Sequence, residues 1–148
     1  MQPAFRMAAD SDVDTLLSLM CEYYAFDHHP FDRARAETAV RGLLQDPALG
    51  GIWLICDREA VVGYVALTFG YSLELLGRDA FVDELFLLES HRRRGWGRQA
   101  VAFIEQAARA LGVRALHLEV TQHNHNANQF YRKLGFQDRE HHLFTKQI

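Results

Sequence analysis

The chain has 148 residues, of which 49% are apolar and 24% charged, which is the balance of an ordinary folded domain and excludes the disordered and fibrous classes. Its formal net charge of −3 leaves no overall basic excess, so we expect neither a nucleic-acid partner nor an anionic membrane as partner. Two cysteines without disulfide or metal spacing, and no signal-peptide pattern or membrane-length apolar run, predict a single cytoplasmic domain over residues 1–148.

The N-terminal part predicts a short strand followed by a helix. Residues 5–7 have strand character, and apolar residues then recur at helical spacing from Val13 to Tyr24. Asp10 or Ser11 should cap the start of this helix, because either side chain can accept a hydrogen bond from a free backbone amide of the first turn.

A second helix and a hairpin follow. Asp32 can cap the second helix, which should end near Asp46 because Pro47 cannot continue it. Two β-rich runs, residues 52–56 and 61–69, flank a polar tetrapeptide. These runs should pair as an antiparallel hairpin.

The next segment predicts a strand, a loop and a helix. Residues 81–88 form the expected strand, and residues 92–97 are rich in arginine and glycine. Residues 100–111 then carry alanine and larger apolar side chains on one helical face, and Gly112 suits the C-terminal cap of this helix.

The C-terminal part should complete the sheet. We expect a strand over residues 113–120, a short helix over residues 124–134 and one or two closing strands over residues 136–145. Strands alternating with helices predict an α/β (α+β) fold of six to seven strands with helices on both faces. Because at least one hairpin is present, the sheet should be mixed.

The loop at residues 92–97 has the features of an anion site. A strand leads into the loop and a helix follows, so backbone amides converge where the helix dipole is positive. Gly95 and Gly97 allow close backbone approach, and the arginines suit a pyrophosphate better than a single carboxylate. A plain strand-to-helix connection with solvated arginines is the alternative. The residues expected to hold the anion are Arg92, Arg93, Arg94, Gly95, Trp96, Gly97 and Arg98.

Other kinds of site are disfavoured by the sequence. The loop has neither the glycine spacing of a dinucleotide fingerprint nor the end of a P-loop. The paired histidines at residues 123 and 125 and at residues 141 and 142 lack the spacing of a metal site, so we expect no metal. Ser90 and His91 lack the turn that presents a nucleophilic serine.

Two motifs resemble those of a known family. Residues 82–87 followed by Arg92-x-x-Gly95-x-Gly97 resemble the acetyl-CoA-binding core of the GNAT N-acetyltransferase superfamily. The downstream run Asn124-x-x-Ala127-x-x-Phe130-Tyr131-Arg132-Lys133-Leu134-Gly135-Phe136 resembles the second signature of that family. The resemblance covers residues 81–136, and one departure from the family pattern is Glu89-Ser90-His91, where a proline-containing turn is common.

The resemblance implies a particular sheet and a particular cosubstrate. The mostly antiparallel sheet would be flanked by about four helices and splayed in the middle, where the strands at residues 81–88 and 113–120 part and admit the pantetheine of acetyl-CoA. Amides of residues 93–98 would hold the pyrophosphate. The backbone near Leu85, Phe86 and Leu87 would hydrogen-bond pantetheine, with Asn124 and Tyr131 completing the cofactor site.

Acetyl transfer to an amine requires a neutral nitrogen, so a base is needed near the acetyl group. Asp83 and Glu84 are adjacent on a strand and should point to opposite faces, which makes at most one of them the base; Glu84 is preferred for its reach. A carboxylate that is merely solvated or paired with an arginine is the alternative. The resemblance implies that Tyr131 protonates the departing thiolate, although a core aromatic would look the same in the sequence.

The acceptor is the least constrained part of the reaction. In the family it commonly lies against the first two helices and the hairpin, and aromatic and acidic residues there suit a cationic amine. We therefore expect a small amine acceptor. Protein lysines or N-termini, a CoA-binding module without catalysis, and a homodimer paired through sheet edges all stay open. The residues concerned are Glu22, Tyr23, Tyr24, Phe26, Asp27, His28, His29 and Tyr71.

Overall fold

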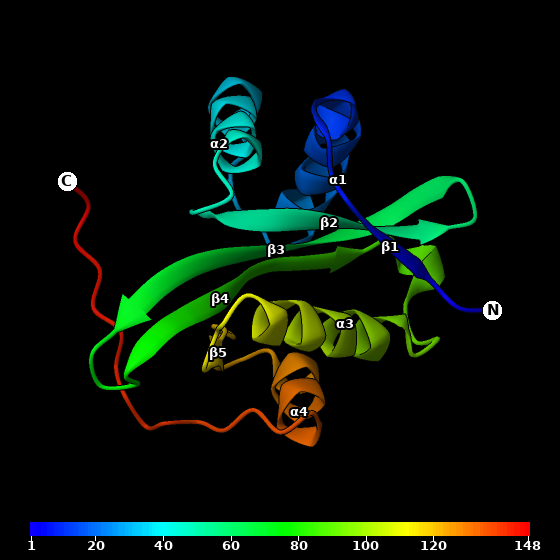
Figure 1. Cartoon of the computed structure of the whole chain (residues 1–148). Coiled ribbons are helices and arrows are strands. Elements are labelled where there is room, and N and C mark those ends of the chain that lie inside the picture. Colours follow the sequence, from blue (N-terminus) through cyan, green and yellow to red (C-terminus); the bar gives the residue numbers. More distant parts are fainter. The chain divides into compact units, whose positions relative to one another are not determined.

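The structure, a computed structural model, describes all 148 residues as two compact units, residues 1–118 and residues 119–148 (Figure 1). That the two units act as the single domain expected from the sequence stays a prediction. The first unit contains β1 (Ala4–Met7), η1 (Asp10–Asp12), α1 (Val13–Phe26), α2 (Arg33–Gln45), β2 (Gly50–Asp57), β3 (Ala60–Ser72), β4 (Gly77–Leu87), η2 (Glu89–His91), α3 (Trp96–Ala110) and β5 (Leu116–His117), and the second contains α4 (His125–Lys133).

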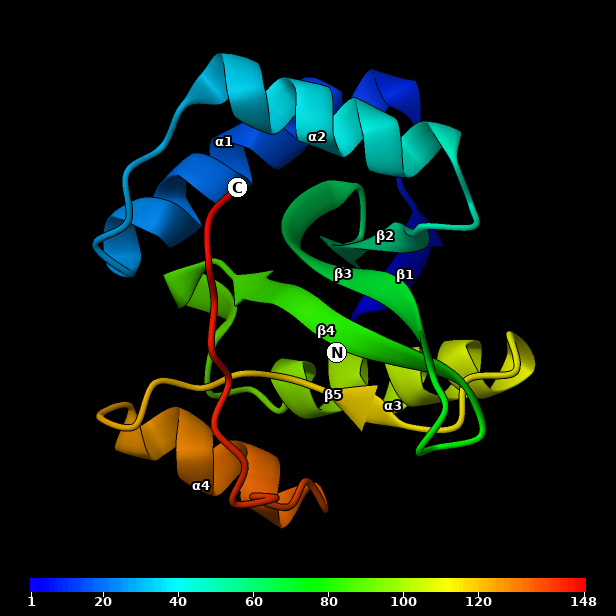
Figure 2. The ribbon, with the colours of Figure 1, turned by 90° about the vertical axis from the view of Figure 1, so that its left-hand side faces the viewer.

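The first unit is a three-layer α/β structure. Its five strands lie in the order β1-β2-β3-β4-β5, antiparallel except for the parallel pair β4–β5. Helices α1 and α2 cover one face of the sheet and α3 covers the other (Figure 2). The predicted mixed, mostly antiparallel sheet with helices on both faces, four helices in all, is confirmed.

Local sequence signals explain where the helices begin and end. Asp32 caps α2 by accepting a hydrogen bond from the amide of Arg35 at 3.1 Å, and α2 ends before Pro47 as predicted. Gly112 follows α3 with a φ of 79°, a left-handed conformation that suits glycine. The cap predicted for α1 at Asp10 or Ser11 is wrong: both residues lie in η1, and the helix begins after Asp12.

The strand count is lower than expected. The structure has five strands instead of six to seven, because residues 136–145 form no strand. β5 is also shorter than the expected strand at residues 113–120. Pairing between β4 and β5 is confined to Ala80 and Phe81 on β4. In the C-terminal segment the large apolar residues Leu143 and Phe144 are exposed, so burial of apolar surface does not stabilise a strand there.

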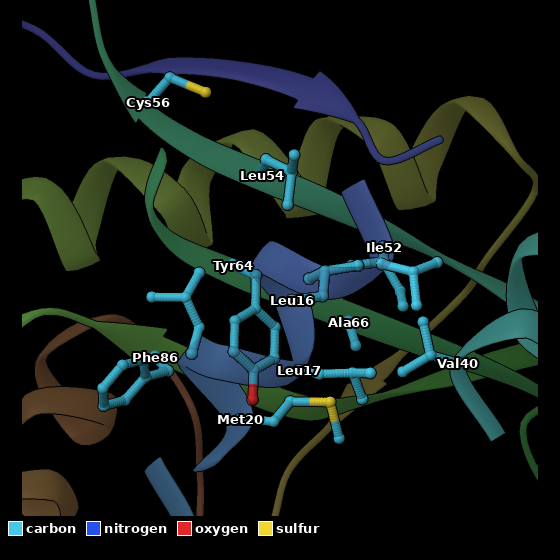
Figure 3. Close-up of a cluster of buried hydrophobic side chains, with 12 residues drawn as sticks. Leu16, Leu17, Met20, Val40, Ile52, Leu54, Cys56, Tyr64, Ala66 and Phe86 are labelled. Carbon is cyan, nitrogen blue, oxygen red and sulfur yellow. The ribbon is translucent and has the colours of Figure 1, made fainter. Parts of the chain in front are cut away.

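The core beneath α1 and α2 surrounds Tyr64. Leu16, Leu17 and Leu54 pack in this cluster and are fully buried, and the Tyr64 ring lies among the same side chains (Figure 3). Cys56 is buried in the same cluster, whereas Cys21 is exposed. No helix has both the length and the apolar character needed to cross a membrane.

Candidate active site

A β-bulge in β4 sets the direction of Glu84. In the β3–β4 ladder Ala66 pairs with Glu84, but the next residue of β3 pairs with Val82, so Asp83 is the extra residue of a bulge. The strict alternation on which we based the opposite orientations of Asp83 and Glu84 is therefore interrupted. Beyond the bulge, the Glu84 side chain reaches Tyr24 of α1, on the face covered by α1 and α2.

Two tyrosines hold the Glu84 carboxylate. The Tyr24 hydroxyl donates to Oε2 at 2.5 Å, and the Tyr64 hydroxyl donates to Oε1 at 2.8 Å. Burial raises the pKa of Glu84, while the two hydroxyls oppose that rise by stabilising the carboxylate. For the phenols these effects act in one direction: burial, together with the neighbouring carboxylate, raises the pKa of both. The arrangement is a partly buried, hydrogen-bonded carboxylate that retains lone pairs for one more donor.

Asp83 has a different environment. Its side chain is exposed, and partial loss of hydration raises its pKa. No hydrogen bond or ion pair fixes its carboxylate in the way that Tyr24 and Tyr64 fix Glu84. The negative charge of Asp83 also raises the pKa of Glu84, so the two groups are electrostatically coupled.

The edge of β4 that faces β5 is open over its second half. The Leu88 amide donates to the Val62 carbonyl at 2.9 Å, so the backbone alternation turns Phe86 toward β3 and turns Leu85 and Leu87 toward the opposite edge. Within the first unit, β5 occupies that edge only at the start of β4. The amide and carbonyl of Leu85 and the amide of Leu87 are therefore placed for an extended ligand, whereas the backbone of Phe86 is used within the sheet.

The glycine and arginine segment forms a helix N-terminus. We call residues 92–97 the phosphate loop. Gly95 is the N-cap of α3 with a φ of 79°, and its carbonyl accepts from the Gln99 amide at 3.1 Å. The following amides, from Trp96 to Arg98, belong to the first helical turn and have no partner within the helix. Arg93, Arg94 and Arg98 are exposed, so positive charge surrounds these amides.

Trp96 and Arg92 have structural side-chain contacts. The Trp96 side chain is only 3% exposed and packs in a core cluster, so only its backbone is available to a ligand. The Arg92 Nε donates to the Leu87 carbonyl at 2.8 Å, and its guanidinium lies 4.7 Å from the Phe26 ring centre and 5.4 Å from that of Phe86. Arg92 thus connects the loop to the end of α1. Beside it is a hollow of about 250 Å³, lined by Glu22, Ala25, Phe26, Phe86, Glu89 and Arg92.

A hydrogen-bonded chain anchors the turn before the loop. The His91 Nε2 lies 3.1 Å from Asp57 Oδ2, and its Nδ1 lies 2.8 Å from the Ser90 hydroxyl oxygen. The His91 ring also packs against Trp96, with 5.2 Å between ring centres. The chain therefore connects the end of β2 to the phosphate loop, a role that the sequence analysis did not assign to these residues. No group of three or more His, Cys, Asp or Glu side chains gathers in a way that could hold a metal ion.

The residues proposed for acceptor binding separate into two places. The Tyr23 ring stacks on Phe86 at 5.4 Å, and Tyr24 contacts Glu84, so both lie beside β4. Asp27 follows α1 and lies 3.5 Å from His29. Tyr71 is 75% exposed, near the other end of β3, about 23 Å from Tyr64 along an extended strand. The structure brings Tyr23 and Tyr24 to the candidate site but not Tyr71.

The second unit contains Asn124 and Tyr131. Asn124 caps α4 by accepting a hydrogen bond from the Ala127 amide at 3.1 Å. Tyr131 packs edge-on against Phe130 and Phe136, with 5.0 and 5.7 Å between ring centres. Burial raises the pKa of the Tyr131 phenol. Its place beside the first unit, and the contact of Asn124 with a cofactor, stay predictions.

Comparisons with known proteins agree on one family. The model of the acetyltransferase (GNAT) family matches residues 13–136. An uncharacterised N-acetyltransferase of Bacillus subtilis (strain 168), YycN, is 41% identical over 61 residues, which cover 41% of this chain and 39% of that protein. The aminoalkylphosphonate N-acetyltransferase of Salmonella typhimurium (strain LT2) is 27% identical over 145 residues, covering 97% of this chain and 90% of that protein. The crystal structure of an integron cassette protein, HFX_CASS3, from the mobile metagenome of Cole Harbour Salt Marsh has a TM-score of 0.88 at 34% identity, covering 97% of this chain and 90% of that one.

Proposed function

Because the chain belongs to the GNAT acetyltransferase family, we propose that it moves the acetyl group of acetyl-CoA directly onto the amine of a small acceptor. The observation that carries the proposal is the position of Glu84 on β4, the strand that leads into the phosphate loop, with its carboxylate held by two tyrosine hydroxyls. A base and an anion site are thus connected by a few residues of chain.

Acetyl-CoA would bind along β4 and at the start of α3. First-turn amides of α3 would hold the pyrophosphate, with charge from Arg93, Arg94 and Arg98. The pantetheine would extend along the open edge of β4 and bond to backbone groups of Leu85 and Leu87. One such amide would also polarise the thioester carbonyl as negative charge develops on its oxygen.

Glu84 would remove a proton from the acceptor ammonium or from the attacking amine. The amine nitrogen then bonds to the thioester carbon, the carbon–sulfur bond breaks, and CoA leaves as a thiolate that Tyr131 protonates; Tyr131 recovers a proton from the nitrogen or from solvent. The raised pKa of Glu84 lies closer to neutral pH, which makes its carboxylate a stronger base than that of an exposed glutamate. Its hydrogen-bonded position supports Glu84 over the exposed Asp83 as the base.

The acceptor would approach the face of β4 covered by α1. Glu22 and Glu89 line the hollow beside this strand, together with Phe26 and Phe86. Carboxylates and aromatic rings suit a cationic amine, and the Salmonella relative is named as an aminoalkylphosphonate N-acetyltransferase. These observations favour a small amine over a folded protein substrate.

Two measurements on one sample test the function. Calorimetry measures acetyl-CoA binding, and release of free thiol is then followed while single amines are added. Micromolar binding with amine-dependent thiol release supports the transferase. If acetyl-CoA binds but no thiol is released with any small amine or lysine-containing peptide, the result supports a CoA sensor instead. Absence of acetyl-CoA binding contradicts the proposal.

A further inference from the structure

The two tyrosines on Glu84 differ in their access to water. Tyr64 is 1% exposed and its ring lies in the core beneath α1 (Figure 3). Tyr24 is partly exposed near the C-terminal end of α1, where its ring packs against Phe31 and His29. The same carboxylate therefore has one tyrosine partner that is fully buried and one that is partly exposed.

A base must lose its proton before the next turnover. A protonated Glu84 needs an acceptor for its O–H, and the phenol oxygens of Tyr24 and Tyr64 are within hydrogen-bond distance at 2.5 and 2.8 Å. A phenol can accept one hydrogen bond while it donates another. Of the two tyrosines, only the partly exposed Tyr24 can pass that proton on to water.

We propose that Tyr24 relays the proton of Glu84 to solvent, whereas Tyr64 fixes the position of the carboxylate. The inference rests on the proposed role of Glu84 as the base. The proton on Oε2 of Glu84 moves to the Tyr24 hydroxyl oxygen as the phenol's own proton moves to a water molecule. Glu84 is then a carboxylate again, Tyr24 is a neutral phenol again, and solvent has gained one proton.

The charges around Glu84 suit a concerted transfer. Burial and the carboxylate raise the pKa of Tyr24, so a free phenolate is disfavoured. The proton that arrives from Glu84 and the proton that leaves the Tyr24 hydroxyl must therefore move together. The titratable groups that act on Glu84 and its two tyrosines are Tyr23 and Tyr24 on α1, Tyr64 on β3 and Asp83 on β4, and His29 packs against the Tyr24 ring. Of these, Tyr24 and Tyr64 stabilise the charged form of Glu84 by hydrogen bonding, while Asp83 disfavours it.

The two tyrosines are matched controls for each other, because Tyr24→Phe and Tyr64→Phe each remove one hydroxyl from the same carboxylate. Steady-state acetyl transfer over many turnovers is followed by thiol release at saturating acetyl-CoA and acceptor, over a range of pH and of small-buffer concentration at constant ionic strength. Both variants should move the acidic limb of the rate profile to higher pH, because each loses a hydrogen bond to the ionised glutamate. Only Tyr24→Phe should also lose about tenfold in rate, recovered as buffer concentration rises.

Equal buffer response of the two variants, or none in Tyr24→Phe, overturns the relay. Failure of the proposed function gives a different result: the unaltered protein then releases no thiol with any amine, or Glu84→Gln keeps the full rate and pH profile. The acetyl-CoA dissociation constant and the free energy of unfolding of each variant show whether it is folded. A buffer response is a readout that a merely structural role of Tyr24 would leave unchanged.

Discussion

The Glu84 cluster (Glu84, Tyr24 and Tyr64) and the phosphate loop are built in different ways. The cluster joins side chains from α1, β3 and β4, which lie 20 and 60 residues apart along the chain. The loop consists of consecutive residues and offers mainly backbone amides at the start of α3. The cluster therefore depends on the packing of three elements, whereas the loop depends on local backbone conformation.

This difference separates catalysis from cofactor binding. A change to the Glu84 carboxylate removes a reacting group but leaves the loop intact, so turnover should fall with unchanged acetyl-CoA affinity. A change to the backbone of the loop should weaken acetyl-CoA binding before it alters the chemistry. Substitutions in the two regions can therefore be told apart by kcat and by the acetyl-CoA dissociation constant.

The largest effect is expected for Glu84→Gln. Loss of the base should lower kcat by about 10² to 10⁴-fold, the usual contribution of a positioned acid or base, with little change in acetyl-CoA affinity. Thiol release measures the first quantity and calorimetry the second. Asp83→Asn is the comparison, with a much smaller expected effect; the reverse order would identify Asp83 as the base.

The pH dependence should report the burial of Glu84. Because burial raises its pKa, the carboxylate becomes protonated, and stops acting as a base, at a higher pH than an exposed glutamate would. Below that pKa, kcat/KM should fall about tenfold per pH unit, and above it the rate should level off. A rate that is constant down to the pKa of an ordinary glutamate would contradict the assignment.

The same contrast explains what the sequence could predict. Contiguous residues predicted the loop at residues 92–97, the helix α3 and its C-terminal cap at Gly112, because glycines and helical periodicity report local backbone conformation directly. The role of Tyr64 was missed because the sequence of an apolar strand does not indicate which group the hydroxyl of its tyrosine will contact.

The orientation of Asp83 and the length of β5 were also not predictable from local sequence. The bulge at Asp83 changes which face a side chain takes, and it results from the β3–β4 ladder rather than from any local residue signal. The short β5 likewise reflects pairing with only two residues of β4, which the strand-like pattern at residues 113–120 could not reveal.

A moderate effect is expected from a side chain at Gly95. The φ of 79° is left-handed, and a Cβ at this position would meet no atom within 4 Å, so a substitution causes strain without a clash. Gly95→Val should raise the acetyl-CoA dissociation constant about tenfold, since a β-branched residue in this region costs about 1–3 kcal/mol. Gly95→Asn, which tolerates that conformation, should cause a smaller loss. Equal losses in calorimetry would mean that the free space, rather than the backbone angle, is required.

The smallest effect is expected at the link between the hairpin and the loop. Asp57→Asn weakens the contact with His91 at 3.1 Å, and since both side chains are partly buried, the free energy of unfolding should fall by about 1 kcal/mol. If the link also fixes the loop, the acetyl-CoA dissociation constant should rise about threefold while the acidic limb of the rate profile stays in place. Urea unfolding and calorimetry give the two quantities. A loss of stability with unchanged affinity would show that local backbone conformation alone shapes the loop, and that only the Glu84 cluster depends on distant contacts.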